Sequence, residues 1–152
     1  MDWGSESLFL SYLVPKAPWL EEAPGADFGD MIRLDAVRYS AQAGPEGEVG
    51  VVLQWRALQE PLPNCRGVLQ IWDETGEALA QRDVRPVNWE RPTHRWSAGE
   101  VVEDRHGLLL AGRSTTPLHL AVSLYDADTG EPVSVAGSTF LELGTLRSDG
   151  SP

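Results

Sequence analysis

Apolar and polar residues alternate along several segments between residues 30 and 143, and a period of two is typical of half-buried β-strands. The clearest segment is 49–57, where five apolar residues share one predicted face: Val49, Val51, Leu53, Trp55 and Ala57. An earlier alternating segment, 32–39, changes phase near Asp35, which predicts a β-bulge. No segment shows a sustained period of 3.6 residues, so little helix is expected.

Two hairpins are predicted from a pattern that occurs twice: an apolar strand, an aromatic residue, Asp and then Thr-Gly-Glu. The first joins segments 68–72 and 78–82, and the second joins 120–125 and 132–133. Similar turns impose similar sequences, so we interpret the pattern as two turns rather than an internal repeat. With further strands at 101–110 and 140–143, the chain is predicted to be an all-β protein. We expect a single antiparallel β-sandwich, immunoglobulin-like or jelly-roll-like, of about seven to nine strands.

The 152 residues are the length of one domain. We expect an aromatic, proline-containing arm over residues 1–26, the sandwich over 27–143 and a polar tail over 144–152. The arm has too many large apolar groups for a free tail, so it is expected to lie along the domain or against a partner. Its candidate docking residues are Trp3, Phe9, Tyr12 and Trp19.

The other tryptophans divide by local pattern. Trp55 and Trp72 lie on predicted strands and are expected in the core. Trp96 is expected to fill the sandwich where a long connection re-enters a sheet. Trp89 lies in a proline-flanked loop, where it either packs on its own loop or is exposed. An exposed indole there would offer a sugar ring a stacking surface.

Charge points to the same region. The net charge is −11, which disfavours nucleic acid and anionic membranes as partners. Six of the eleven arginines lie between residues 82 and 113, against five acids. An anionic or sugar-like ligand is therefore expected in this segment, and the candidate ligand-binding residues are Trp89, Arg91, His94 and Arg95. The alternative is that these arginines pair with neighbouring acids on a solvated face.

Catalytic and metal-binding motifs are weak. The three histidines lack zinc-site spacing, and His119 is expected on the solvent face of its strand. The turn 126–131 resembles part of a calcium loop but lacks the oxygen ligands that complete one. Glu100, Glu103 and Asp104 would serve in glycoside hydrolysis only if they faced one cleft. No catalytic residue, metal or cofactor is predicted, and a hydrolase is the third alternative.

Membrane signals are also weak. The apolar run 8–14 has seven residues, whereas a helix needs about 20 to cross a bilayer. Acidic residues precede this run where a signal peptide has a positive region. We therefore expect no membrane span and no signal peptide. The single cysteine, Cys65, leaves the compartment undetermined.

Several segments together resemble a known domain. They are 28–34 (FGDMIRL), 51–57 (VVLQWRA), 68–71 (VLQI), 80–86 (AQRDVRP), 92–104 (PTHRWSAGEVVED) and 122–130 (VSLYDADTG). The longest is similar to the pattern P-T-x-x-W-x-x-G-E-x-v-x-D of that domain. In this order the segments resemble the C-terminal extracytoplasmic β-sandwich domain of multi-pass bacterial, Chloroflexi-type glycosyltransferases that are dolichyl-phosphate-mannose mannosyltransferase-like.

The resemblance implies a non-catalytic domain outside the cytoplasmic membrane, with a sugar or a membrane-associated protein as partner; without it, a cytoplasmic location is expected. Two segments depart from the family pattern: 64–67 (NCRG) replaces an Asp-Tyr pair, and 113–117 (RSTTP) replaces a Pro-Pro-Gly turn. The similarity covers only the β-sandwich, so it does not imply transferase activity. It also assigns no ligand residues.

These observations lead to one function hypothesis and its alternatives. The first is a non-enzymatic accessory domain that binds a partner, with a carbohydrate as the candidate ligand around residues 89–95. The second is a structural subunit that docks through the N-terminal aromatic arm. The third is the hydrolase that would use the carboxylates of residues 100–104.

Overall fold

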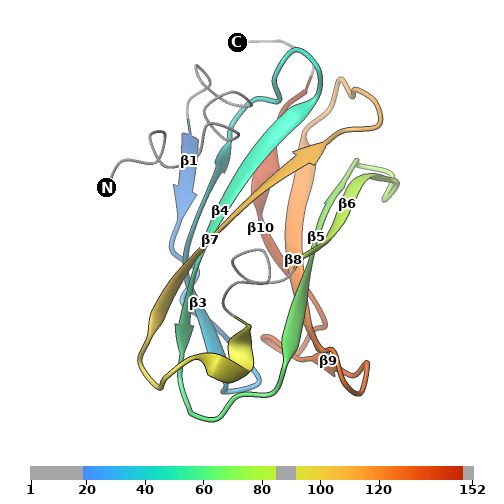
Figure 1. The fold of residues 1–152 in the computed structure, drawn as a ribbon. Coiled ribbons are helices and arrows are strands. Elements are labelled where there is room, and N and C mark those ends of the chain that lie inside the picture. Colours follow the sequence, from blue (N-terminus) through green and yellow to red (C-terminus); the bar gives the residue numbers. More distant parts are fainter. Residues whose placement is uncertain (1–18, 85–91, 149–152) are drawn as a thin grey trace.

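A computed structural model describes residues 19–84 and 92–148, with no side-chain description at residues 83 and 84. These residues form β-strands and a short 3₁₀ turn, Thr93–Arg95 (Figure 1). The strands are β1 (Trp19–Glu22), β2 (Ala26–Phe28), β3 (Ile32–Ser40), β4 (Glu48–Ala57), β5 (Cys65–Trp72), β6 (Ala78–Val84), β7 (Val101–Leu109), β8 (Leu118–Asp126), β9 (Pro132–Val133) and β10 (Leu141–Leu146).

The strands form two antiparallel sheets that face each other (Figure 1). In the first sheet the order is β1-β3-β4-β7, and β2 pairs with β3 on the same edge as β1. In the second sheet the order is β10-β8-β5-β6, and β9 pairs with β8. The predicted all-β sandwich is confirmed. The described residues form ten strands because two short segments share one edge of each sheet: β1 and β2 both pair with β3, and β9 and β10 both pair with β8.

The strand order is that of an immunoglobulin-like sandwich. The chain crosses between the sheets after β4, β6 and β7, so that β4 pairs with β7 and β5 pairs with β8. Immunoglobulin-like domains pair their second and fifth strands in one sheet, and their third and sixth strands in the other. If β3 is counted as the first strand, these are the pairs β4–β7 and β5–β8. Strands β1 and β2 extend this arrangement along the free edge of β3.

The core lies between the sheets and follows the predicted alternation. The inward residues of segment 49–57 are buried, and Trp55 is 2% exposed. Phe28 meets the Trp55 ring edge-on, with ring centroids 5.5 Å apart. The predicted bulge is confirmed as a shift of register between Leu34 and Ala36. Trp96, 1% exposed, fills the core as expected.

Trp72 does not lie in the core, so this prediction was wrong. Leu69 and Ile71 are buried between the sheets, and strand alternation then turns Trp72 to the outer face, where it is half-buried. It pairs there with His119 of β8, which faces outward as predicted.

Hydrogen bonds connect the two sheets along both open sides of the sandwich. On one side, the Ala111 amide donates to the Leu79 carbonyl at 2.7 Å. On the other, the Arg147 amide donates to the Ala41 carbonyl and the Ala43 amide donates to the Arg147 carbonyl. These bonds satisfy backbone groups that would otherwise be left at the sheet ends.

A polar pair is buried among the apolar side chains of the core. Asp104 and His106 both point inward from β7, and each side chain is 1% exposed. Nε2 of His106 lies 2.7 Å from Oδ1 of Asp104, although the two groups are not aligned as a directed hydrogen bond. The other carboxylate oxygen accepts from Nε1 of Trp55 at 3.3 Å.

The paired strands extend beyond the predicted limits of the sandwich. Residues 19–22 and 26–28 pair with β3, although residues up to 26 were expected in the arm. At the other end β10 runs to Leu146, which is buried, although the tail was expected from residue 144. The rest of the predicted arm, 1–18, lies outside the described residues. Among those described, no helix is long and apolar enough to span a bilayer.

Replacement of Trp55 by alanine tests the core. Trp55→Ala removes a fully buried indole and leaves Asp104 without its Nε1 donor, so it is expected to lower the free energy of unfolding by about 3–5 kcal/mol. Urea denaturation measures this loss. The control is Gln54→Ala, an exposed position on the same strand, where a change within about 0.5 kcal/mol is expected. A loss below about 1 kcal/mol for Trp55→Ala would contradict the packing.

Candidate functional site

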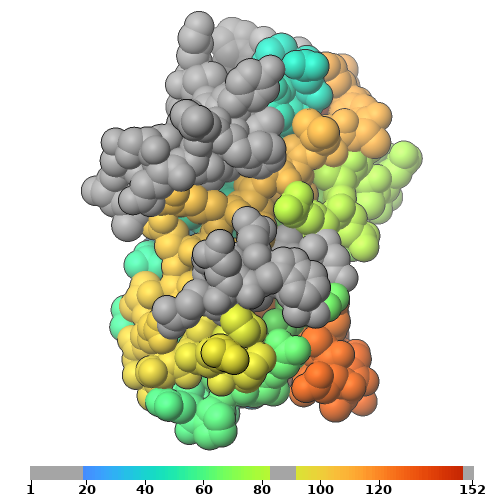
Figure 2. Space-filling model, viewed as in Figure 1, coloured from blue at the N-terminus to red at the C-terminus, as the bar shows by residue number. Residues whose placement is uncertain are grey.

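The first candidate site is the 3₁₀ turn, which is anchored to the segment between β4 and β5. The Thr93 hydroxyl donates to the Pro63 carbonyl at 2.6 Å and accepts from the Cys65 amide at 2.8 Å. Trp96 holds the other end of the turn in the core. Figure 2 shows the residues after 91, in yellow, at the surface beside the green segment that follows β4. The turn is therefore a fixed surface feature.

Only part of the predicted ligand site can be placed. His94 and Arg95 are exposed on the turn, as a binding role requires. Trp89 and Arg91 lie outside the described residues. Of the predicted docking residues, Trp3, Phe9 and Tyr12 are also outside them. Trp19 is half-buried at the start of β1, where it pairs with Ser40.

The cysteine beside this turn is a structural residue in this arrangement. Cys65 is buried, and burial raises the pKa of its thiol to about 11, despite the opposing effect of the Thr93 hydroxyl. A thiol with this pKa is almost entirely protonated at neutral pH, and the thiolate is the nucleophilic form.

The three carboxylates considered for hydrolysis do not face one cleft. Asp104 is in the core, whereas Glu103 points outward and bonds to Arg105. The Oε1 atom of Glu100 accepts a hydrogen bond from the Ser97 amide at 3.0 Å, which closes a local turn. The paired-carboxylate site is therefore not formed by these residues.

In the calcium-like segment, the side chain of Asp126 forms hydrogen bonds within its own hairpin turn. Oδ1 of Asp126 accepts from the amides of Asp128 and Thr129, at 2.9 and 3.4 Å. In residues 19–84 and 92–148, no three His, Cys, Asp or Glu side chains gather as a metal-binding group.

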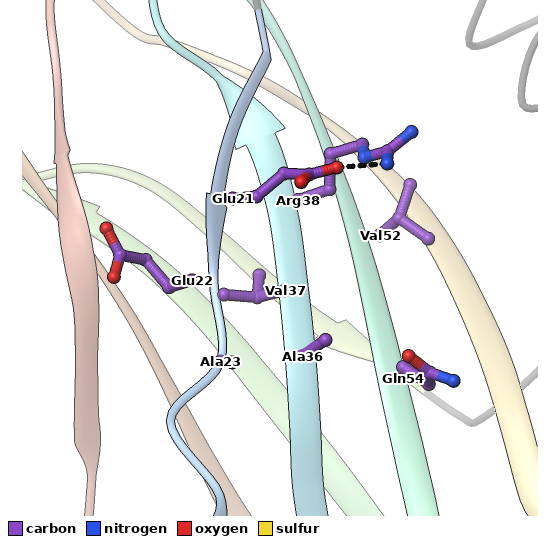
Figure 3. Close-up of a pocket in the computed structure, with 8 residues that line it drawn as sticks. All are labelled: Glu21, Glu22, Ala23, Ala36, Val37, Arg38, Val52 and Gln54. Carbon is purple, nitrogen blue, oxygen red and sulfur yellow. Dashed lines mark hydrogen bonds and ion pairs between the residues drawn. The ribbon is translucent and has the colours of Figure 1, made fainter.

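The outer face of the first sheet is covered by ion pairs between its own residues. Among the described residues, these pairs are Arg33–Asp27, Arg38–Glu21, Arg56–Asp35 and Arg105–Glu103. A hollow of about 440 Å³ lies on this face, over β1, β3 and β4 (Figure 3). In Figure 3, Glu21 and Arg38 meet at one end, Gln54 lies at the other, and Glu22 points away. Arg38 and Glu21 neutralise each other and the side chain of Glu22 points away, so the hollow offers a ligand little specific chemistry.

The outer face of the second sheet is built differently. Cross-strand partners share a face, so the register places Trp72, His119 and Thr145 in one outward row. The adjacent row holds Gln81, Gln70, Ala121 and Glu142. Nε2 of Gln70 donates to Oε1 of Gln81 at 3.1 Å. Aromatic, amide and carboxylate groups are thus presented together on rigid strands.

Trp72 is the centre of this surface. Its ring stacks on His119 with centroids 6.4 Å apart and planes 24° apart. Phe140 meets it edge-on at 5.6 Å and is 44% exposed, which makes it one of the few large apolar side chains open to water among the described residues. We call Trp72, His119, Phe140, Glu74 and Glu142 the Trp72 surface.

Two carboxylates hold His119 in this surface. Its Nδ1 lies 2.9 Å from Oε2 of Glu142, and its Nε2 lies 3.3 Å from Oε1 of Glu74. The hydrogen bond to Glu142 raises the pKa of His119 above its ordinary value, and Glu74 adds to the effect while burial opposes it. The side chains of both glutamates are about half exposed, so these carboxylates are in contact with solvent.

Sequence reasoning did not find this surface. Trp72 was expected in the core, and His119 was placed on the solvent face without a role. One signal was present in the sequence, namely the alternation of side chains along a strand. If Leu69 and Ile71 face inward, Trp72 must face outward. The contact with Phe140 depends on the fold, because the two rings are 68 residues apart (140 − 72).

Comparison with known proteins adds no assignment. A scan against protein-family models finds no match, and a search of curated protein sequences finds no similar protein. The resemblance to the glycosyltransferase-associated sandwich domain therefore stays a prediction.

The anchoring of the turn is tested at Thr93. Thr93→Val removes both hydroxyl hydrogen bonds and leaves the Pro63 carbonyl and Cys65 amide unsatisfied, so it is expected to lower the free energy of unfolding by about 1–3 kcal/mol. Thr93→Ser keeps the hydroxyl and should recover most of this loss. Urea denaturation compares the two variants. Equal losses would show that the hydroxyl does not anchor the turn.

The ion pairs of His119 predict that the stability of the fold depends on pH. Because its folded pKa is raised, His119 stabilises the fold most below its unfolded pKa of about 6.5, and this contribution is lost as the pH rises through the folded pKa. The stability difference between wild type and His119→Gln should therefore shrink from about pH 5.5 toward pH 8.

Direct titration of His119 by NMR measures the pKa itself. Glu142→Gln should lower this pKa more than Glu74→Gln, because the Glu142 hydrogen bond is the larger cause. An unchanged titration in both variants would contradict the arrangement.

Proposed function

We propose that the chain is a non-catalytic accessory domain that binds a carbohydrate through the Trp72 surface. The observation that carries this proposal is the group of half-buried and exposed aromatic rings, Trp72 and Phe140, beside carboxylates and amides on one sheet face. We therefore propose the outer face of the second sheet as the binding surface, instead of residues 89–95.

The chemistry of the surface suits a sugar. A sugar ring has apolar C–H faces and a rim of hydroxyls, so it is bound by an aromatic ring together with planar hydrogen-bonding side chains. The amides of Gln70 and Gln81 both donate and accept, whereas Glu74 and Glu142 accept only. Gln70, Gln81 and Glu142 lie on strands of this sheet, which fix their positions before a ligand arrives, and Glu74 lies in the turn between β5 and β6.

The contrast between the two outer faces supports this choice. On the first sheet, four arginines pair with four acids, the exposed apolar residues of β7 are the aliphatic Val101 and Leu109, and the half-buried Trp19 lies on the edge strand β1. On the second sheet the largest outward side chain is an indole, in contact with an exposed phenyl ring. An apolar group kept at the surface beside polar groups is a feature of binding sites.

The family resemblance supports an accessory role, since it implies a non-catalytic sandwich domain outside the membrane. It carries no ligand residues, and the transferase activity of the whole enzymes is not proposed for this chain. The 3₁₀ turn is the second location considered for the same ligand, because His94 and Arg95 are exposed donors on an anchored segment.

The proposal is tested by calorimetric titration with a panel of neutral, amine-bearing and acidic oligosaccharides. Trp72→Ala is expected to weaken the binding more than tenfold, as truncation of a central aromatic contact does, while Trp72→Phe should keep part of the affinity. His94→Ala with Arg95→Ala serves as the control and should bind as wild type does. Denaturation of each variant checks that the fold is intact.

Two results would overturn this assignment. If no saccharide in the panel binds, the carbohydrate function fails. If binding is lost in the double variant of the turn but kept in Trp72→Ala, the site lies at the turn and the Trp72 surface is not the binding face.

A further inference from the structure

We propose that the Trp72 surface selects saccharides that carry a protonated amine and disfavours those that carry carboxylates. This inference rests on the proposed carbohydrate function and names the ligand class of the same surface. It depends on the charges that surround the aromatic rings.

The local charge is negative in either state of His119. Glu74 and Glu142 provide two negative charges against one imidazolium, so the group has a formal charge of −1 when His119 is protonated and −2 when it is neutral. A ligand ammonium group therefore brings the group closer to neutrality, whereas a uronic carboxylate is repelled.

The surrounding residues reinforce this charge. Asp73, in the turn that follows Trp72, accepts hydrogen bonds from Thr75 that lower its pKa, so it stays ionised. Arg66, which faces outward from the same strand, is six residues before Trp72 and hence roughly 20 Å away along β5. It is too distant to neutralise the two glutamates at ordinary ionic strength.

The aromatic rings favour the same ligand. A cation near the face of an indole or phenyl ring is attracted by the electrons of the ring. His119 already covers one side of Trp72, and the exposed ring of Phe140 lies across the edge of the indole. An amino sugar that approaches Phe140 can thus stack its C–H face on a ring while its ammonium group reaches Glu142 or Glu74.

The experiment compares three oligosaccharides of equal length with the whole chain by calorimetry: glucosamine oligomers, their N-acetylated counterparts and galacturonic acid oligomers. At mildly acidic pH, where the amines are protonated, the glucosamine oligomer is expected to bind about fivefold more tightly than the acetylated one, the difference given by one partly exposed ion pair. Raising the salt concentration should reduce this preference.

Charge-neutral variants identify the groups responsible. Glu142→Gln and Glu74→Gln should each reduce the preference for the amine about two- to threefold. Glu131→Gln is the matched control, because Glu131 is an exposed glutamate in the corresponding Thr-Gly-Glu turn of the other hairpin. That turn follows Tyr125, which is six residues from His119 along β8, or roughly 20 Å. This control should keep the wild-type preference.

The outcomes separate the two proposals. Equal binding of the amine-bearing and acetylated oligomers, or tighter binding of the acidic one, overturns the selectivity and leaves the carbohydrate function standing. A preference that Glu131→Gln removes as strongly as Glu142→Gln also overturns it, because the preference would then come from the net charge. If none of the three oligosaccharides binds, both proposals fail.

Discussion

Close packing of side chains between two facing sheets is the constraint on which the rest of the structure depends. The inner faces of a sandwich interdigitate in a layer about 10 Å thick and leave little empty space. Here that layer is filled by Trp55, Phe28 and Trp96 with the aliphatic residues around them. Since each strand alternates, filling this layer also decides which side chains must face water.

The same layer contains a polar pair whose burial has a physical cost. Asp104 and His106 are each 1% exposed, and taking charged or polar groups out of water is unfavourable unless they are paired. The carboxylate is compensated by the Trp55 indole and by the nearby imidazole. Removal of the Trp55 indole would take one hydrogen bond from this buried carboxylate, so β4 and β7 are linked by a side-chain contact as well as by their backbone hydrogen bonds.

How far the sequence predicts this molecule depends on whether a feature is local. The strand 49–57 and the bulge near Asp35 were predicted because alternation and its interruption are visible in consecutive residues. Trp72 was not, because Ile71 and Trp72 are adjacent apolar residues and either could have faced inward; only pairing with β6 and β8 decides this. The contacts of His119 with Glu74 and Glu142 join residues 45 and 23 positions apart (119 − 74 and 142 − 119), and no spacing rule indicates them.

The two outer faces show how one acidic chain can have surfaces with opposite properties. On the first sheet, arginine and carboxylate side chains neutralise each other, and a charged ligand would have to compete with pairs already formed. On the second sheet, the only partner of the two glutamates beside Trp72 that the described contacts show is one histidine. The two glutamates beside the half-buried Trp72 and the exposed Phe140 therefore carry more negative charge than this histidine can neutralise. Strands fix Trp72, His119 and Glu142 in advance, and a surface whose groups are already in place loses little conformational freedom when it takes part in binding.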